Sequence, residues 1–147
     1  MKKYTFLISL VCVLANSSTI LWAQQGITGK VEWISGNQMP GPDRPTSKAQ
    51  GIKREILIYQ PVAMSDVDAS DGVFFSNVKT ALVKKAKSNC KGRFRVKLPP
   101  GEYSLFTKEK KGLFANQFDG QGRIQCIVVK PGEFTEVTIR VNYEASY

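Results

Sequence analysis

Residues 88–103 read SNCKGRFRVKLPPGEY and carry the clearest structural signal of this 147-residue chain. Between residues 93 and 98 a basic side chain alternates with an apolar one. This is the two-residue period of a strand with one buried face and one solvated face. The run Pro99-Pro100-Gly101 ends this strand in a tight turn. We therefore predict a hairpin between this strand and a second one at residues 103–107.

The same period recurs on both sides of this stretch. It is clearest at residues 137–143, where apolar and polar side chains alternate without a break. Residues 78–87 have a mixed pattern, which we interpret as a strand. Turn-forming Gly, Pro and Asn residues separate these segments, and short strands at such spacing predict an all-β sandwich or barrel. The remaining strand candidates are residues 27–34, 55–59 and 124–129.

Two segments do not fit the strand pattern. Residues 40–51 are polar and rich in proline, so we predict a loop. Residues 61–76 form an insertion, which we expect either to hold a helical turn or to stay mobile.

Two motifs of the chain resemble those of carboxypeptidase regulatory-like domains. Residues 88–94 are similar to the family's Thr/Ser-Asp-x-x-Gly-x-Phe turn, with Asn89 in place of the usual Asp, and residues 98–103 are similar to its Leu-Pro-Pro-Gly-x-Tyr element. The resemblance implies an all-β, seven-stranded antiparallel Greek-key sandwich of the prealbumin (transthyretin) type, with one inserted loop at 61–76. It also implies a non-catalytic module. The family's first strand and loop are matched by Gly29-Lys30-Val31, Gly36 and Pro40.

The first 23 residues have the pattern of a secretory signal peptide. Two lysines precede a short apolar stretch at residues 4–15, and the small residue Ala23 stands at a plausible cleavage point. We expect residues 1–23 to be removed and residues 24–147 to form one domain that is periplasmic or extracellular. The alternative is an uncleaved anchor helix. No later apolar run is long enough to span a bilayer, so no transmembrane span is expected after cleavage.

Two cysteines, Cys90 and Cys126, belong to the expected mature domain. An oxidising compartment favours a disulfide between them. Two chain reversals would bring both to one end of the sandwich. Pairing also requires Cα atoms within about 7 Å, which topology alone does not establish. A disulfide and two separate thiols are therefore the two alternatives.

The chain is basic, with a formal net charge of +9. Its positive charge is concentrated between residues 84 and 111, where ten lysines and arginines face only two acidic residues. Such a field attracts anionic partners; the alternative is a solvated face that protects an edge strand from aggregation. We expect a protein or an anionic glycan at the cell envelope as partner, and no nucleic acid. The candidate anion-binding residues are Lys91, Arg93, Arg95 and Lys97.

Aromatic side chains give a second candidate for glycan binding. Phe114 and Phe118 lie in a predicted loop at residues 113–118, where they either hold a ligand or close one end of the sandwich. We expect Trp33 in the core instead, because it shares the strand parity of Val31 and large aromatic residues are mostly buried.

The composition argues against an enzyme. The chain has no histidine, which excludes the commonest catalytic base and every pair of a serine or cysteine with histidine. Residues 66–72 are acidic but lack the ligand spacing of an EF-hand. An isopeptide bond between Lys30 and Asn142, with Glu109 as the assisting acid, is disfavoured because Asn142 has the parity of the solvated face.

We therefore predict a non-catalytic exported β-sandwich module that interacts with another macromolecule. The alternative is a carbohydrate-binding module for cell-envelope or host glycans. Neither interpretation calls for a cofactor or a metal.

Overall fold

The computed structural model describes residues 24–147, so the predicted signal peptide lies outside the described residues. Within them the chain folds into eleven β-strands and one 3-10 turn, η1. No helix in this described part is long and apolar enough to cross a membrane. The elements are β1 (Gly26–Asn37), β2 (Gln50–Gly51), β3 (Glu55–Tyr59), η1 (Met64–Asp66), β4 (Asp68–Ser70), β5 (Phe74–Ser76), β6 (Leu82–Lys87), β7 (Arg93–Lys97), β8 (Gly101–Glu109), β9 (Gly112–Phe114), β10 (Cys126–Val129) and β11 (Phe134–Ser146).

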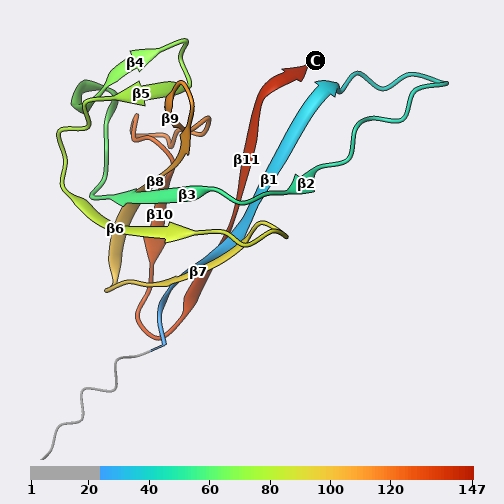
Figure 1. Ribbon diagram of the computed structural model, residues 1–147. Helices are drawn as coiled ribbons and strands as arrows, with labels where there is room; N and C mark the ends of the chain where they lie inside the picture. The colour runs from blue at the N-terminus through green and yellow to red at the C-terminus, as the bar shows by residue number, and fades with distance from the viewer. Residues whose placement is uncertain (1–23) are drawn as a thin grey trace, which may run out of the picture.

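The strands form two sheets, as the predicted all-β sandwich requires (Figure 1). In the first sheet β11 runs along one edge of β1, and β7 and β2 pair with successive parts of its other edge. The second sheet has the order β4-β5-β9-β8-β3-β6, and β10 also pairs with β8. The predicted fold class is therefore confirmed.

The structure has four strands beyond the seven expected; β2 and β9 are short, and β4 and β5 belong to the insertion at residues 61–76. The predicted helical turn of this insertion is η1, and β4 and β5 follow as a hairpin that joins the second sheet through β9. One pair also differs in direction, since β1 and β11 are parallel rather than antiparallel. Almost the whole domain separates these two strands in sequence, so no short turn forces them to run in opposite directions.

The predicted hairpin across Pro99-Pro100-Gly101 is wrong. β7 pairs with β1 in the first sheet, whereas β8 pairs with β3, β9 and β10 in the second. The turn therefore passes the chain from one sheet to the other. The prolines donate no amide hydrogen to a ladder, and the Tyr103 hydroxyl closes the bend by donating to the carbonyl of Pro99 at 2.7 Å.

Two hydrophobic cores lie on opposite faces of the second sheet. β8 shows this directly, because the adjacent residues Leu105 and Phe106 are both fully buried but belong to different cores. The main core fills the space between the two sheets. The smaller core lies under the insertion, whose Val62 and Phe75 pack over Phe106. The insertion is thus a structural cover for the outer face of the second sheet.

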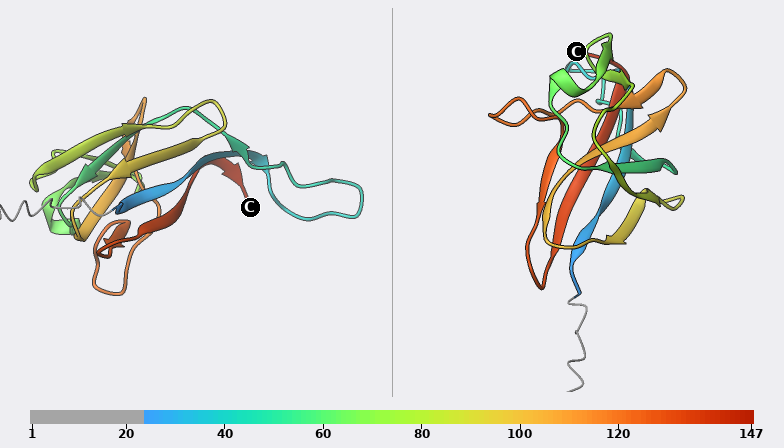
Figure 2. Two further views of the ribbon diagram at one scale, coloured as in Figure 1. Left: turned by 90° about the horizontal axis from the view of Figure 1, so that it is seen from below. Right: turned by 90° about the vertical axis from the view of Figure 1, so that its left-hand side faces the viewer.

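The predicted polar loop at residues 40–51 is present except at its end, where Gln50 and Gly51 form β2. Figure 2 shows that the segment between β1 and β2 extends away from the body of the sandwich.

The turn between β6 and β7 is built by local hydrogen bonds and by close backbone packing. The side-chain oxygen of Asn89 accepts the backbone N–H groups of Lys91 and Arg93, each at 3.0 Å. Gly92 has a φ of +81°, and a Cβ at this position would lie 2.2 Å from the carbonyl oxygen of Val31. Glycine is therefore required here, and it presses the turn against β1.

Candidate functional site

The strands β6 and β7 are neighbouring edge strands of the two sheets, and both carry exposed cations. Among residues 24–147 β6 pairs only with β3 and β7 pairs only with β1, so each is an edge strand of a different sheet. The turn at residues 88–92 joins them, and they run along the same side of the molecule (Figure 1). We call this surface the basic edge; its seven exposed cations are Lys84, Lys85, Lys87, Lys91, Arg93, Arg95 and Lys97.

Few acidic groups neutralise the basic edge. Within residues 24–147 the seven cations form one ion pair, between Lys85 and Glu55 at 3.7 Å. The Lys84 ammonium donates to the carbonyl of Lys97 at 3.1 Å and so connects the two strands. The Arg95 guanidinium carbon lies 3.7 Å from the centre of the Phe134 ring, which holds the side chain flat on the surface. Most of these charges are therefore free to attract an anion.

The four cations named from the sequence lie together, as their alternation predicted. Arg93, Arg95 and Lys97 point to solvent from β7, while the apolar residues between them are buried. Lys91 lies in the preceding turn and is also exposed. Sequence reasoning could not show that the strand carrying Lys84, Lys85 and Lys87 is the neighbouring edge of the other sheet. On that strand Lys84 reaches toward β7, whereas Lys85 shares the outer face of the second sheet with its cross-strand neighbour Leu57.

Phe114 and Phe118 do not form a joint site. Phe114 is fully buried in β9, and its ring packs against Phe74 and Tyr143 between the sheets. Its proposed role in stacking on a glycan is therefore wrong. Phe118 lies in the following loop and is 49% exposed. The sequence around Phe114 has no strand pattern, so its core position became visible only from its contacts with Phe74 and Tyr143.

Cys90 and Cys126 are both free, so the disulfide alternative is wrong. Cys90 follows β6, and Cys126 begins β10, with β3 and β8 lying between these two strands in the sheet. Three strand spacings amount to about 14 Å, twice the Cα separation that a disulfide allows. The two chain reversals counted from the sequence take no account of this sideways distance.

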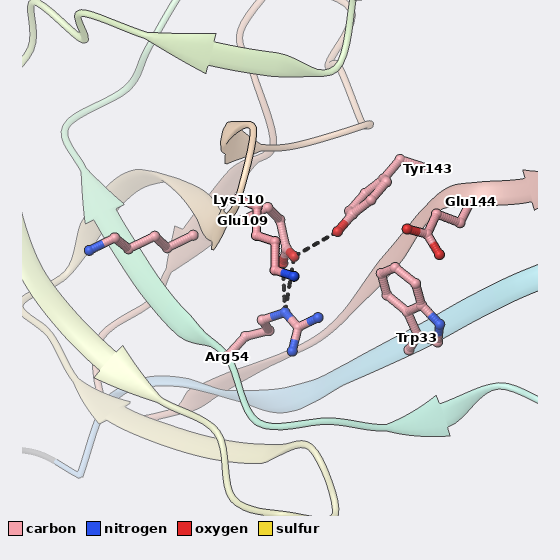
Figure 3. A pocket seen from close by; sticks show the side chains of 7 residues that line it. Trp33, Arg54, Glu109, Lys110, Tyr143 and Glu144 are labelled. Carbon is pink, nitrogen blue, oxygen red and sulfur yellow. Dashed lines mark hydrogen bonds and ion pairs between the residues drawn. The ribbon is translucent and has the colours of Figure 1, made fainter.

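A pocket opens between the two sheets, close to the turn that ends the basic edge. It is open to solvent and has a volume of about 420 Å³. The first sheet contributes Trp33, Tyr143 and Glu144 to its lining. The other wall consists of Arg54, just before β3, and residues 108–110 at the end of β8 (Figure 3). The Ser88 hydroxyl ties this wall to the basic edge, because it accepts the backbone N–H of Arg54 at 2.7 Å.

A buried carboxylate organises the back of this pocket. The Glu109 side chain is only 3% exposed. Its two oxygens accept the Nε–H of Arg54 at 2.9 and 3.1 Å, and one of them accepts the hydroxyl of Tyr143 at 3.1 Å. Burial raises the pKa of Tyr143, and the negative charge of Glu109 raises it further. Tyr143 is therefore held as a neutral hydrogen-bond donor.

Trp33 lies at this pocket rather than fully inside the core. Its ring meets Tyr143 edge-to-face with centroids 5.1 Å apart, and the Arg54 guanidinium carbon lies 5.7 Å from its centroid. The expectation that Trp33 is a core residue holds only in part, because its ring is half-buried and packs at the margin of the main core. No local pattern links Trp33 to Arg54 and Glu109, which come from three separate segments.

The residues considered for an isopeptide bond are not brought together. Lys30 donates to Glu32 at 2.8 Å, and Asn142 accepts from Asn116 at 2.7 Å, while Glu109 is engaged with Arg54. Within residues 24–147 no three His, Cys, Asp or Glu side chains gather as metal ligands would.

No protein-family model, curated protein or solved structure matches this chain.

Proposed function

We propose that this chain is a non-catalytic exported binding module that holds an acidic polysaccharide along the basic edge. One observation carries the proposal. Seven exposed cations line two neighbouring edge strands, and only Lys85 has an ion-pair partner among residues 24–147. Lysine and arginine side chains at neutral pH donate hydrogen bonds and offer no acceptor, so such a surface suits carboxylate and sulfate groups.

The chemistry of the surface favours a polysaccharide over a folded protein. Stable protein interfaces have a core rich in aromatic and apolar side chains and poor in charge. On β6 and β7 the exposed large apolar residues are Leu82 and Val83, both at one end of β6. The rest of the surface is cationic, with outward side chains at every second residue of β7. A chain of sugars with repeating acidic groups meets such a row without needing an apolar anchor.

Retention on immobilised heparin tests the proposal. The triple variant Arg93→Glu, Arg95→Glu, Lys97→Glu removes a large part of the basic edge. Its matched control is Lys48→Glu, Lys79→Glu, Lys130→Glu, which changes the net charge equally at exposed positions elsewhere. We expect the unmodified protein and the control to elute only at raised salt, because added ions screen exposed charges beyond about 8 Å at physiological ionic strength. The triple variant should elute without added salt, because it has lost the cations of β7 and carries carboxylates in their place.

Two outcomes would contradict the proposal. Equal losses in the triple variant and in the control would mean that net charge alone causes retention. Binding to polyglutamate that is as tight as binding to heparin, at equal charge and salt, would point to an acidic protein as the partner.

A further inference from the structure

We propose that the pocket between the sheets is a second binding site, which takes one uncharged sugar ring. Its fixed part is the ion pair of Arg54 and Glu109 with the hydroxyl of Tyr143. These contacts use the Nε of Arg54 and both carboxylate oxygens of Glu109, and they hold the walls in place before any ligand arrives. Because these side chains are already ordered, little binding free energy is lost in ordering them when a ligand binds.

Several polar groups at the pocket remain without partners. One terminal nitrogen of Arg54 donates to the carbonyl of Lys53 at 2.9 Å, and the other has no partner among residues 24–147. Within the same residues the Lys110 ammonium and the Glu144 carboxylate form no ion pair. Figure 3 shows the Arg54 guanidinium and the Glu144 carboxylate on either side of the space beside Trp33. The pocket therefore offers donors and an acceptor next to aromatic rings.

The lining contains the cations Arg54, Lys108 and Lys110 and the carboxylates Glu109 and Glu144, so its net charge of +1 is small and does not demand a charged ligand. Glu109 neutralises Arg54 at 2.9 Å, and Lys108 lies 3.9 Å from Glu55 outside the pocket. Lys110 and Glu144 remain, with opposite charges. A sugar hydroxyl both donates and accepts, so neighbouring hydroxyls can use the guanidinium and the carboxylate together, while the C–H face of the ring packs on the aromatic walls. The volume of about 420 Å³ lies within the usual range of small-ligand pockets.

An amino acid is the other small ligand with balanced charge. The choice of a sugar rests on the proposed function, because the Ser88–Arg54 hydrogen bond places the pocket at the end of the basic edge. A polysaccharide lying on that edge reaches the pocket with one of its sugar units.

Trp33 provides a direct readout. The chain has two tryptophans, Trp22 and Trp33, so a Trp22→Phe variant reports only on the pocket. The emission of Trp33 in this full-length variant is followed during titration with the methyl glycosides of glucose, galactose and N-acetylglucosamine. The salt concentration is about 1 M, which screens the basic edge to about 3 Å. We expect a saturable change with at least one glycoside.

Substitutions in the Trp22→Phe background locate the site. Glu144→Ala should weaken binding about tenfold, because it removes a charged hydrogen-bond acceptor. Glu136→Ala changes another exposed glutamate of β11 and should leave the affinity unchanged. The charge reversal of Arg93, Arg95 and Lys97 should also leave it unchanged. The heparin experiment therefore tests the basic edge and the glycoside titration tests the pocket, and either proposal can fail without the other. No saturable change with any glycoside, equal affinity after Glu144→Ala, or a response to free alanine alone would overturn the inference.

Discussion

The Nε of Arg54 lies 2.9 and 3.1 Å from the two carboxylate oxygens of Glu109, and this pair joins the segment before β3 to the end of β8. It is the most buried ion pair within residues 24–147, with side-chain exposures of 30% and 3%. Arg54 also contacts Trp33, and Glu109 also accepts from Tyr143. The pair therefore connects both sheets at the pocket and fixes the geometry on which ligand binding there depends.

Loss of this pair should destabilise the fold more than loss of a surface pair. Glu109→Gln should lower the free energy of unfolding by about 1–3 kcal/mol, less than for a fully buried pair because Arg54 is partly solvated. Glu55→Gln is the control, since its pairs with Lys85 and Lys108 are 3.7 and 3.9 Å long and exposed, and it should cost less than about 0.5 kcal/mol. Urea denaturation measures both. Equal costs would contradict the central role of Glu109.

High pH should destabilise the protein through three tyrosines that folding buries wholly or in part. Burial raises the pKa values of Tyr59, Tyr103 and Tyr143, so the unfolded chain loses these protons at a lower pH than the folded chain does. The stability they contribute is full below the ordinary tyrosine pKa of about 10 and is lost as pH rises through the folded values. Thermal denaturation from pH 8 to pH 11.5 should show this fall. An unchanged melting temperature over that range would refute it.

Titration of Tyr143 should respond to Glu109. Because the carboxylate raises the pKa of this tyrosine by its charge and its hydrogen bond, Glu109→Gln should lower it. Ultraviolet absorbance at 295 nm during a pH titration detects tyrosinate, and Tyr143→Phe identifies the transition that belongs to Tyr143. A Tyr143 transition at the same or a higher pH in Glu109→Gln would show that the carboxylate does not act on the phenol.

The two thiols should react with labelling reagents at different rates. Cys90 is exposed, whereas Cys126 is half-buried and burial raises its pKa. Because the thiolate is the reactive form, we expect a fast phase from Cys90 and a phase at least about tenfold slower from Cys126. Cys90→Ser should remove the fast phase. If unfolded, unreduced protein yielded neither thiol, a disulfide would exist and the strand order β6-β3-β8-β10 would be wrong.

Comparison of Gly92→Ala with Gly36→Ala should separate the cost of backbone strain from the cost of a steric clash in the free energy of unfolding. Gly92 has a φ of +81°, and an added Cβ would lie 2.2 Å from the carbonyl oxygen of Val31. Gly36 has a similar φ of +75° with nothing within 4 Å of its added Cβ. Gly36→Ala should therefore cost about 1 kcal/mol from strain alone, and Gly92→Ala clearly more. Equal unfolding midpoints for the two variants would mean that the turn moves away from β1 without penalty.

The alternation at residues 93–98 was enough to predict which side chains of β7 are solvated and which are buried. The same holds for residues 137–143 within β11, and together these periods predicted the all-β class. This information is local, because the direction of successive side chains in a strand depends only on the backbone of that strand. The sequence also located the cations of β7, since they alternate with the core residues.

Pairing between strands depended on contacts between distant residues, and there the sequence was insufficient. The Pro99-Pro100-Gly101 turn is compatible with a hairpin and with a passage between sheets, and burial of both flanking strands against different partners selects the passage. The sideways order of β6, β3, β8 and β10 separates Cys90 from Cys126. The meeting of Trp33, Arg54, Glu109 and Tyr143 likewise arises only when the two sheets pack, because these residues come from distant segments and their polar contacts become stronger where water is largely excluded.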